Sequence, residues 1–251
     1  PTMIGGERSA RVTVPPAYDG RTRLPAVFAL PGYGVTATEL DEWLDLSSRV
    51  ERLGFVLVHA EGTRNHDGEP FWNATDTCCD YYDAGVDDDA WLSALRRELL
   101  EKIAVDETRL YLLGHSNGAF MAYHLACDHA GEWTALASLA GSMWTDLARC
   151  AASGPVNVLQ VHGTQDRIMP YAGDDEAPGA EAVLARWQVL NDCEPDRAPD
   201  PQPREYVNDV VVQETEIQRA ICRGARGVEL WKMNEARHAP DFRPSFTDDL
   251  L

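Results

Sequence analysis

The most constraining feature of this 251-residue chain is a glycine-flanked serine at 114–118, where the sequence reads Gly-His-Ser-Asn-Gly. An apolar run over 109–113 precedes it and a second apolar segment over 119–123 follows it, which predicts a strand, a tight turn and a helix. Glycine on both sides suits a turn too tight for side chains, and the strained turn lifts the serine hydroxyl clear of the sheet. We therefore interpret Ser116 as a nucleophile. The simpler alternative is a serine that only caps a helix.

A serine hydroxyl is a weak nucleophile at neutral pH and needs a base that a third group orients. Where this turn carries a nucleophile, the acid and then the histidine follow it along the chain. The apolar runs 156–161 and 228–233 each predict a strand, and the loops after them carry Asp166 and His238. We predict that these two are the acid and the base, because sites of open α/β sheets lie at strand carboxyl ends. The alternatives are a turn-forming aspartate and an ordinary loop histidine.

The other six histidines are weaker candidates for the base. Two lie in polar surroundings that follow no late strand, His66 and His129. Four lie within or beside apolar segments, where a structural imidazole is the expected role: His59, His115, His124 and His162.

Acyl transfer also needs donors directed at the developing oxyanion. The backbone N–H of Asn117, directly after the serine, is one predicted donor. The loop 31–34, Pro-Gly-Tyr-Gly, follows a predicted strand over 26–30 and supplies the second, for which we choose the N–H of Tyr33. The alternative is an ordinary glycine-rich turn.

The acidic run 87–89 precedes a helical pattern and has two interpretations. One is a calcium site; the other, which we favour, is negative charge complementing the dipole at a helix N-terminus. The chain has no C-x-x-C motif and no histidine at zinc-finger spacing, so no metal site is predicted. The chemistry inferred for Ser116 requires no cofactor.

Several motifs in order along the chain resemble those of one family. They are Leu-Pro-Gly-Tyr at 30–33, Phe-Trp-Asn-Ala at 71–74, Cys-Cys at 78–79, Gly-Val-Asp-Asp at 85–88, Gly-His-Ser-Asn-Gly at 114–118, His-Gly-Thr-Gln-Asp at 162–166, Pro-Tyr at 170–171 and His-Ala-Pro at 238–240. Together they resemble secreted carboxylesterases of the polyhydroxybutyrate depolymerase and feruloyl esterase group, within the α/β-hydrolases, over about residues 10–245. The resemblance implies triad roles for Ser116, Asp166 and His238 and oxyanion roles for Tyr33 and Asn117. It also implies that Trp72 lines the substrate pocket.

The chain departs from that family at two places. The family carries His-Gly at the oxyanion loop, whereas Pro31 and Gly32 stand here. The Pro-Gly-Tyr form is similar to cutinase-like polyester hydrolases, in which the tyrosine ring is also a substrate platform. Residues 236–240, Ala-Arg-His-Ala-Pro, replace the family's Gly-Gly-His-Ala-Trp-Pro, so Arg237 is expected to alter the wall beside His238.

The even count of six cysteines, in a chain that resembles secreted esterases, points to disulfides and to an extracellular or periplasmic location. We expect Cys193 to pair with Cys222 across a proline-rich insertion. We expect Cys78 and Cys79 to form separate disulfides, one with Cys127 and the other with Cys150. The alternative is six free thiols in a cytosolic enzyme. Residues 1–6 carry no basic, apolar leader, so a mature or trimmed form is expected.

Length and charge limit the partners of the protein. The net charge of −19 argues against nucleic acid, anionic membrane surfaces and strongly anionic substrates. The sequence contains no run of 18 apolar residues, so no membrane span is predicted. The length suits one catalytic domain over 1–251, and a monomer is expected.

Other segments carry coarser expectations. We predict one helix over 38–53 and a long functional loop over 61–83 at the mouth of the site. Trp144 follows a strand over 135–139 and is expected to shape the pocket. Residues 193–208 predict an irregular excursion, and 209–219 a strand or hairpin.

Alternating strands and helices predict an α/β-hydrolase fold with a mostly parallel central sheet and helices on both faces. The predicted function is a serine carboxylester hydrolase that acts through an acyl-enzyme. Its expected substrates are feruloyl-type aryl esters or polyester chains of the hydroxyalkanoate kind. The alternatives are a serine peptidase of the same fold and a binding protein that has lost the chemistry.

Overall fold

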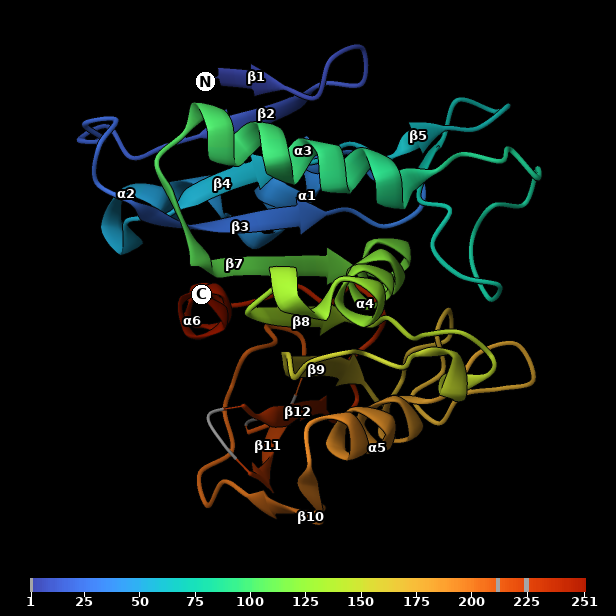
Figure 1. Cartoon of the computed structure of the whole chain (residues 1–251). Coiled ribbons are helices and arrows are strands. Elements are labelled where there is room, and N and C mark those ends of the chain that lie inside the picture. The colour runs from blue at the N-terminus through green and yellow to red at the C-terminus, as the bar shows by residue number, and fades with distance from the viewer. Residues whose placement is uncertain (1, 211–212, 224–225) are drawn as a thin grey trace.

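A ten-stranded sheet forms the centre of the computed structural model, which describes residues 2–210, 213–223 and 226–251 (Figure 1). In chain order its strands are β1 (Thr2–Ile4), β2 (Ala10–Thr13), β3 (Leu24–Leu30), β4 (Val56–His59), β7 (Val105–His115), β8 (Ala135–Leu139), β9 (Asn157–Gly163), β10 (Cys193–Pro199), β11 (Thr215–Cys222) and β12 (Val228–Met233). Across the sheet the order is β1-β2-β4-β3-β7-β8-β9-β12-β11-β10. A separate two-stranded pair joins β5 (Thr63–Arg64) to β6 (Pro70–Phe71).

The middle of the sheet is parallel. Strands β4, β3, β7, β8, β9 and β12 pair in parallel, while β1, β2, β11 and β10 pair antiparallel at the two edges. The carboxyl ends of β7, β9 and β12 therefore meet at one end of the sheet, where loops from distant parts of the sequence come together.

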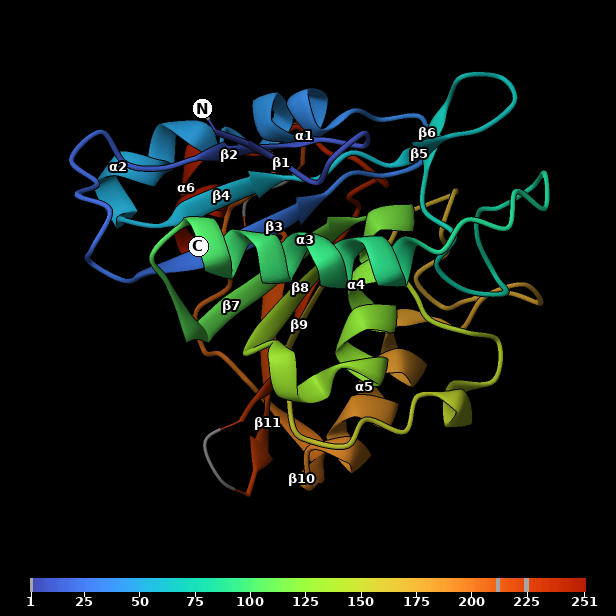
Figure 2. The same ribbon diagram turned by 45° about the horizontal axis from the view of Figure 1, so that its top comes forward.

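Helices cover both faces of the sheet (Figures 1 and 2). They are α1 (Ala37–Leu44), α2 (Val50–Leu53), α3 (Asp88–Lys102), α4 (Asn117–Asp128), α5 (Ala180–Leu190) and α6 (Pro244–Leu250), with 3₁₀ turns at Ser47–Arg49, Ala130–Glu132 and Leu147–Arg149. Helices α3, α4 and α5 bury apolar side chains in one cluster on their face. Residues of α1, α2 and α6 share the cluster on the opposite face. The predicted α/β architecture, with helices on both faces, is confirmed. No helix in the described ranges is long and apolar enough to cross a membrane.

Two local predictions need correction. The helix predicted over 38–53 is interrupted, because Asp45 adopts a left-handed conformation with φ of 51° and ends α1 there. Residues 193–208 are not wholly irregular, since β10 forms the edge of the sheet over Cys193–Pro199. Of the strand or hairpin expected over 209–219, β11 begins only at Thr215, and Val211 and Val212 lie outside the described residues.

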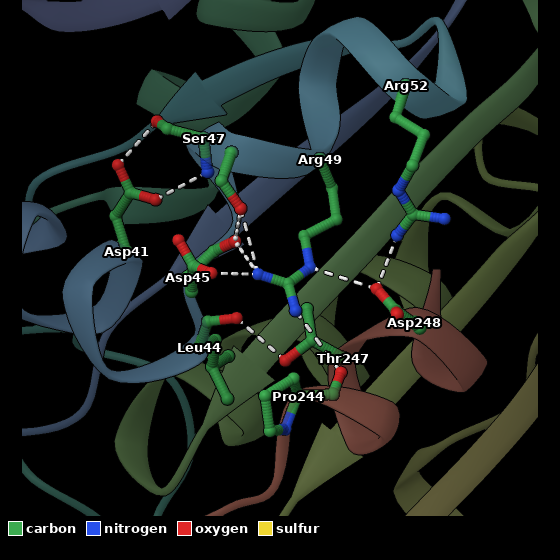
Figure 3. Close-up of polar contacts among 10 residues, drawn as sticks. Asp41, Leu44, Asp45, Ser47, Arg49, Arg52, Pro244, Thr247 and Asp248 are labelled. Carbon is green, nitrogen blue, oxygen red and sulfur yellow. Dashed lines mark hydrogen bonds and ion pairs between the residues drawn. The ribbon is translucent and has the colours of Figure 1, made fainter.

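A buried arginine joins the segment after α1 to the C-terminal helix (Figure 3). The Arg49 side chain is only 7% exposed and donates to the carbonyl of Asp45, to the carbonyl of Pro244 and to the carboxylate of Asp248, at 3.0, 3.2 and 3.1 Å. Nearby, the Thr247 hydroxyl donates to the Leu44 carbonyl at 2.7 Å. These bonds fasten α6 to the 44–49 segment, although about 200 residues separate them in sequence.

We expect Arg49→Ala to lower the free energy of unfolding by roughly 2–3 kcal/mol, because it leaves several partners of a buried guanidinium unsatisfied. Arg52 is the matched control: it pairs with the same Asp248 carboxylate but is 56% exposed. Arg52→Ala should cost less than about 1 kcal/mol. Urea denaturation of both variants measures the difference, and equal losses would contradict the role given to Arg49.

Candidate active site

Ser116 occupies the turn between β7 and α4. Its φ of 52° and ψ of −123° lie outside the regions that non-glycine residues favour, as expected of a residue held in a strained turn. The Ser116 N–H donates to the Leu139 carbonyl at 2.8 Å, which ties the turn to the end of β8. The predicted strand–turn–helix arrangement around Ser116 is therefore present.

The two glycines of the turn are required by close backbone packing. A Cβ on Gly118 would lie 2.0 Å from the Leu30 carbonyl oxygen, and one on Gly114 would lie 2.4 Å from the Gly118 carbonyl oxygen. On the facing loop, a Cβ on Gly32 would lie 3.2 Å from the Ser116 Cβ. The start of α4, the end of β3 and the loop after it thus approach closer than side chains permit.

Asp166 and His238 meet at the carboxyl ends of β9 and β12. The distance from His238 Nδ1 to Asp166 Oδ2 is 2.7 Å. The two loops also share a backbone bond of 2.9 Å, in which Gln165 N–H donates to the Ala236 carbonyl. Because the carboxylate holds Nδ1, Nε2 is the nitrogen that the imidazole offers to a further group.

The Asp166 carboxylate is buried and held on both of its oxygens. Its Oδ1 accepts from the backbone N–H groups of Ile168 and Met169, at 2.9 and 2.8 Å. Burial acts to raise the pKa of the Asp166 carboxyl, but hydrogen bonds from His162 and His238 outweigh it and place that pKa well below its usual value. Asp166 is therefore a fixed negative charge beside His238.

His162 supports this carboxylate. Its Nε2 lies 2.8 Å from the Met169 carbonyl and 3.4 Å from Asp166 Oδ2, which requires the proton on Nε2. Its Nδ1 lies 3.0 Å from Gln160 Nε2, a donor, and so accepts. The expectation of a structural role for His162 agrees with these contacts, although no pattern in the sequence indicated that His162 would hold Asp166.

Trp72 links the 31–34 loop, which carries Tyr33, to the start of α4. Its backbone N–H donates to Asn117 Oδ1 at 2.7 Å, and Asn117 Nδ2 donates back to the Trp72 carbonyl at 2.9 Å. The Trp72 indole N–H donates to the Pro31 carbonyl at 2.9 Å. One residue therefore fixes both backbone segments that carry the predicted oxyanion donors, the N–H groups of Tyr33 and Asn117.

A cavity of about 460 Å³ opens at Ser116. Ser116, His238 and Tyr33 line it, so three of the five predicted catalytic and oxyanion residues are at its wall. The sequence analysis did not single out Tyr81, Ile168 and Met169, which also line it. Tyr81 belongs to the 61–83 loop, and the expectation that this loop borders the site is confirmed for Thr77, Cys78, Cys79 and Tyr81.

The pocket roles expected of Trp72 and Trp144 are corrected. Trp72 is fully buried and its ring packs against Arg8 and Trp91 rather than facing the cavity. Trp144 is also buried and borders a neighbouring hollow, where it packs against His124. Neither residue lines the cavity at Ser116. Tyr33 keeps the expected place, and its hydroxyl accepts from Asn65 Nδ2 at 2.7 Å.

All six cysteines form disulfides, with pairing that differs in part from the expectation. Cys193 pairs with Cys222, as predicted. Cys127 pairs with Cys150, their Cα atoms 5.2 Å apart, and Cys78 pairs with its neighbour Cys79. The predicted links from Cys78 and Cys79 to the other two are therefore wrong, because the end of α4 lies against the segment that carries Cys150. The Cys78–Cys79 disulfide lines the cavity instead.

The chain is similar in sequence to one family model and to several known proteins. Residues 2–226 match the model of the family described as "Putative esterase". "Putative esterase NocK" of Nocardia uniformis subsp. tsuyamanensis is 28% identical over 218 residues, 86% of this chain and 55% of that protein, so the chain spans about half of its length. "Feruloyl esterase C" of Emericella nidulans is 30% identical over 211 residues, 78% of this chain and 68% of that protein.

Among solved structures, "Acetyl xylan esterase from Aspergillus awamori" superposes with a TM-score of 0.71, over 99% of this chain and 96% of that one, at 12% identity. This likeness confirms the predicted α/β-hydrolase fold.

Replacing Trp72 with phenylalanine tests whether its indole positions the oxyanion loop. We expect kcat to fall roughly tenfold with KM little changed, because a displaced oxyanion donor weakens the transition state more than the bound ester. Trp231→Phe is the control, since its indole N–H donates to the Glu229 carboxylate at 2.6 Å and not to this loop. A Trp72→Phe enzyme with unchanged kcat, measured on a p-nitrophenyl ester, would contradict this role.

Stability should also depend on the neutral His115 ring beneath the site. Burial, with a smaller contribution from His238, lowers the pKa of His115 to about 3. Below about pH 6.5 the unfolded chain binds a proton there that the folded chain does not, so the free energy of unfolding falls by up to ~1.4 kcal/mol per pH unit toward pH 3.

His115→Gln should reduce that slope, while His66→Gln, at an exposed histidine, should leave it unchanged. Urea melts between pH 3.5 and 7 provide the measurement. Equal slopes in the two variants would show that His115 is not the group responsible.

Proposed function

This chain belongs to the esterase family whose model it matches, and from that premise we propose that it hydrolyses carboxylic esters through an acyl-enzyme on Ser116. The observation that carries the proposal is the 2.7 Å contact between His238 Nδ1 and Asp166 Oδ2, beside a cavity that Ser116 and His238 both line. A nucleophile, a base and an orienting acid are the three parts that acyl transfer requires.

In the proposed reaction, Ser116 Oγ attacks the ester carbonyl carbon while His238 Nε2 accepts the hydroxyl proton. The negative charge of Asp166 holds the proton of the other nitrogen and stabilises the imidazolium that forms. His238 then returns the proton to the leaving alcohol as the carbon–oxygen bond breaks. Water attacks the acyl-enzyme by the same route, and the carboxylic acid leaves with Ser116 restored.

The N–H groups of Tyr33 and Asn117 are the proposed oxyanion donors. The first N–H groups of α4 have no carbonyl of their own helix to bind, so Asn117 offers its N–H at the positive end of the helix dipole. The neighbouring loop is held from both sides, since Gly34 N–H donates to the Pro70 carbonyl at 2.8 Å and the Pro31 carbonyl accepts from Trp72. Preorganised donors of this kind are worth about 10²–10³ in rate each.

We propose an aryl carboxylic ester, of the feruloyl type, as the substrate class. The relative from Emericella nidulans carries the name feruloyl esterase. The cavity volume of about 460 Å³ suits a small ligand, and its walls include the rings of Tyr33 and Tyr81, which lie 5.4 Å apart edge to face. Aromatic rings at such walls pack favourably against an aryl acid. The carboxylates of Asp174 and Glu176 also border the cavity and disfavour an anionic ester.

A polyester chain is the second candidate substrate, and the exposed rim of the cavity favours it. Ile168 and Tyr81 are each 69% exposed and both line the cavity. An exposed apolar rim beside a nucleophile suits contact with an extended, uncharged polymer. This candidate corresponds to the depolymerase part of the sequence resemblance.

We further propose that residues 1–251 form one catalytic domain and that the protein works outside the cytoplasm. Strands from both ends of the chain share the central sheet, which supports a single domain. Three disulfides support an oxidising compartment. The peptidase and binding-protein alternatives are not favoured, because the family and the named relatives are esterases.

A fluorophosphonate probe and an ester panel test the proposal together. The wild-type protein should take up one label, and Ser116→Ala should take up none and lose ester hydrolysis by a factor of about 10⁴ or more. Ser142→Ala is the matched control, a buried serine whose hydroxyl donates to the Pro178 carbonyl. Labelling that persists in Ser116→Ala would overturn the assignment of the nucleophile.

The panel contains methyl ferulate, a short p-nitrophenyl ester and hydroxybutyrate polymer. Turnover of methyl ferulate with the highest kcat/KM is the expected result. Faster release from the polymer would favour the second candidate, and turnover of the short ester alone would contradict both substrate classes.

A further inference from the structure

Two histidines and two aspartates meet on the outer side of α3 and α4, away from Ser116. His124 and Asp128 lie one turn apart on α4, and Asp89 lies in the first turn of α3. His124 Nε2 is 3.3 Å from Asp128 Oδ2 and 3.7 Å from Asp89 Oδ2. The other Asp89 oxygen, Oδ1, is 2.6 Å from His129 Nε2.

The three acidic residues at 87–89 have different tasks, and only Asp89 faces these histidines. Asp87 caps α3 by accepting from the Ala90 N–H at 2.8 Å. Asp88 is buried, pairs with Arg8 and accepts from the Asn73 N–H at 2.6 Å. The dipole interpretation therefore accounts for the first residue of the run. Asp89 Oδ1 is held by His129 and by the Ser93 hydroxyl, which donates to it at 3.4 Å, whereas Oδ2 lies toward His124.

The proton on His124 is placed by its partner. His124 Nδ1 lies 2.5 Å from the Ala74 carbonyl oxygen, which can only accept, so Nδ1 carries a hydrogen. In the neutral ring Nε2 then carries a lone pair, and that lone pair faces two carboxylate oxygens. Such an arrangement is repulsive unless Nε2 also carries a proton or a metal ion lies between the three atoms.

The spacing of these atoms fits a small metal ion. Tetrahedral Zn²⁺ with bonds of about 2.0–2.1 Å holds neighbouring ligand atoms roughly 3.3 Å apart. The three ligand atoms from Asp89, His124 and Asp128 all lie within 4.8 Å of one another, and two of the separations are 3.3 and 3.7 Å. Asp89 and His124 also border a hollow of about 640 Å³, which gives water access to a fourth position.

We propose that Asp89, His124 and Asp128 bind one divalent transition-metal ion of the Zn²⁺ type. An imidazole ligand favours such an ion over Ca²⁺ or Mg²⁺, which prefer oxygen ligands throughout. The Ala74 carbonyl and His129 orient the ligands from outside, as the partners of metal-binding histidines and carboxylates do. The ion links the first turn of α3, the last turn of α4 and, through Ala74, the segment that leads to Cys78.

The proposal differs from the metal-free expectation and from one other explanation of the cluster, a protonated His124 paired with two carboxylates. The ion would stabilise the helix that begins at the nucleophile without touching the ester. Its presence is therefore tested by binding and stability, not by catalysis.

The test uses the intact protein after treatment with a chelator, titrated with Zn²⁺ against a chromophoric chelator and separately with Co²⁺. We expect one equivalent of tight binding, visible Co²⁺ absorption, and a rise in Tm of roughly 5–10 °C at 100 times the Kd. His124→Asn is the sharpest variant, because asparagine keeps a donor toward the Ala74 carbonyl and removes Nε2. Asp128→Asn removes one ligand charge at a half-exposed position.

Each variant should weaken Zn²⁺ binding by about 100-fold or more and abolish the Tm rise. His66→Asn, an exposed histidine beside Asp67, should bind as the wild type does. Wild-type protein without saturable binding would overturn the proposal and favour the protonated His124. Binding of equal strength in Asp128→Asn and wild type would overturn it too, by placing the ion elsewhere.

Discussion

The close approach of α4 to the end of β3 is the constraint on which the site depends. A side chain at Gly118 would overlap the Leu30 carbonyl, so the helix can begin there only because that position is glycine. This approach forces Ser116 into its positive φ and brings the loop at Gly32 within contact of the serine. The proposed nucleophile and the 31–34 loop therefore owe their relative position to backbone packing, not to contacts between their own side chains.

The proposed acid and base, Asp166 and His238, are held in place in a different way. Asp166 is buried, and its charge is kept by donors from its own loop, from His162 and from His238. Because that network is complete on both carboxylate oxygens, the imidazole of His238 has one defined orientation. The walls of the cavity come largely from separate loops around 77–81 and 168–177. The proposed reacting groups thus lie at the ends of strands. The residues that would contact the substrate lie on loops outside the sheet.

Prediction from the sequence succeeded where local backbone geometry requires a particular type of residue. The glycines around Ser116 and the strand-end positions of Asp166 and His238 follow from strand and turn geometry, and the structure places them accordingly. Prediction failed where the outcome depends on which way a side chain turns. Trp72 lies in the predicted 61–83 loop, yet its ring is buried in the core, because its indole N–H donates to the Pro31 carbonyl. The pairing of Cys78 with Cys79 could not be inferred either, since it depends on how α4 meets the segment before β9.

The proline-bearing strand β10 is also the last strand of the sheet, and its composition has a consequence for behaviour in concentrated solution. Pro195 and Pro199 lack the N–H that another chain would need to extend the sheet, and Asp196 and Arg197 add charge at the same border. The Cys193–Cys222 disulfide links β10 to β11. This bond opposes separation of β10 from the sheet, which would expose the unpaired backbone groups of β11. The prolines and charges that made this segment resemble a loop in the sequence therefore also disfavour pairing of β10 with a strand of another molecule.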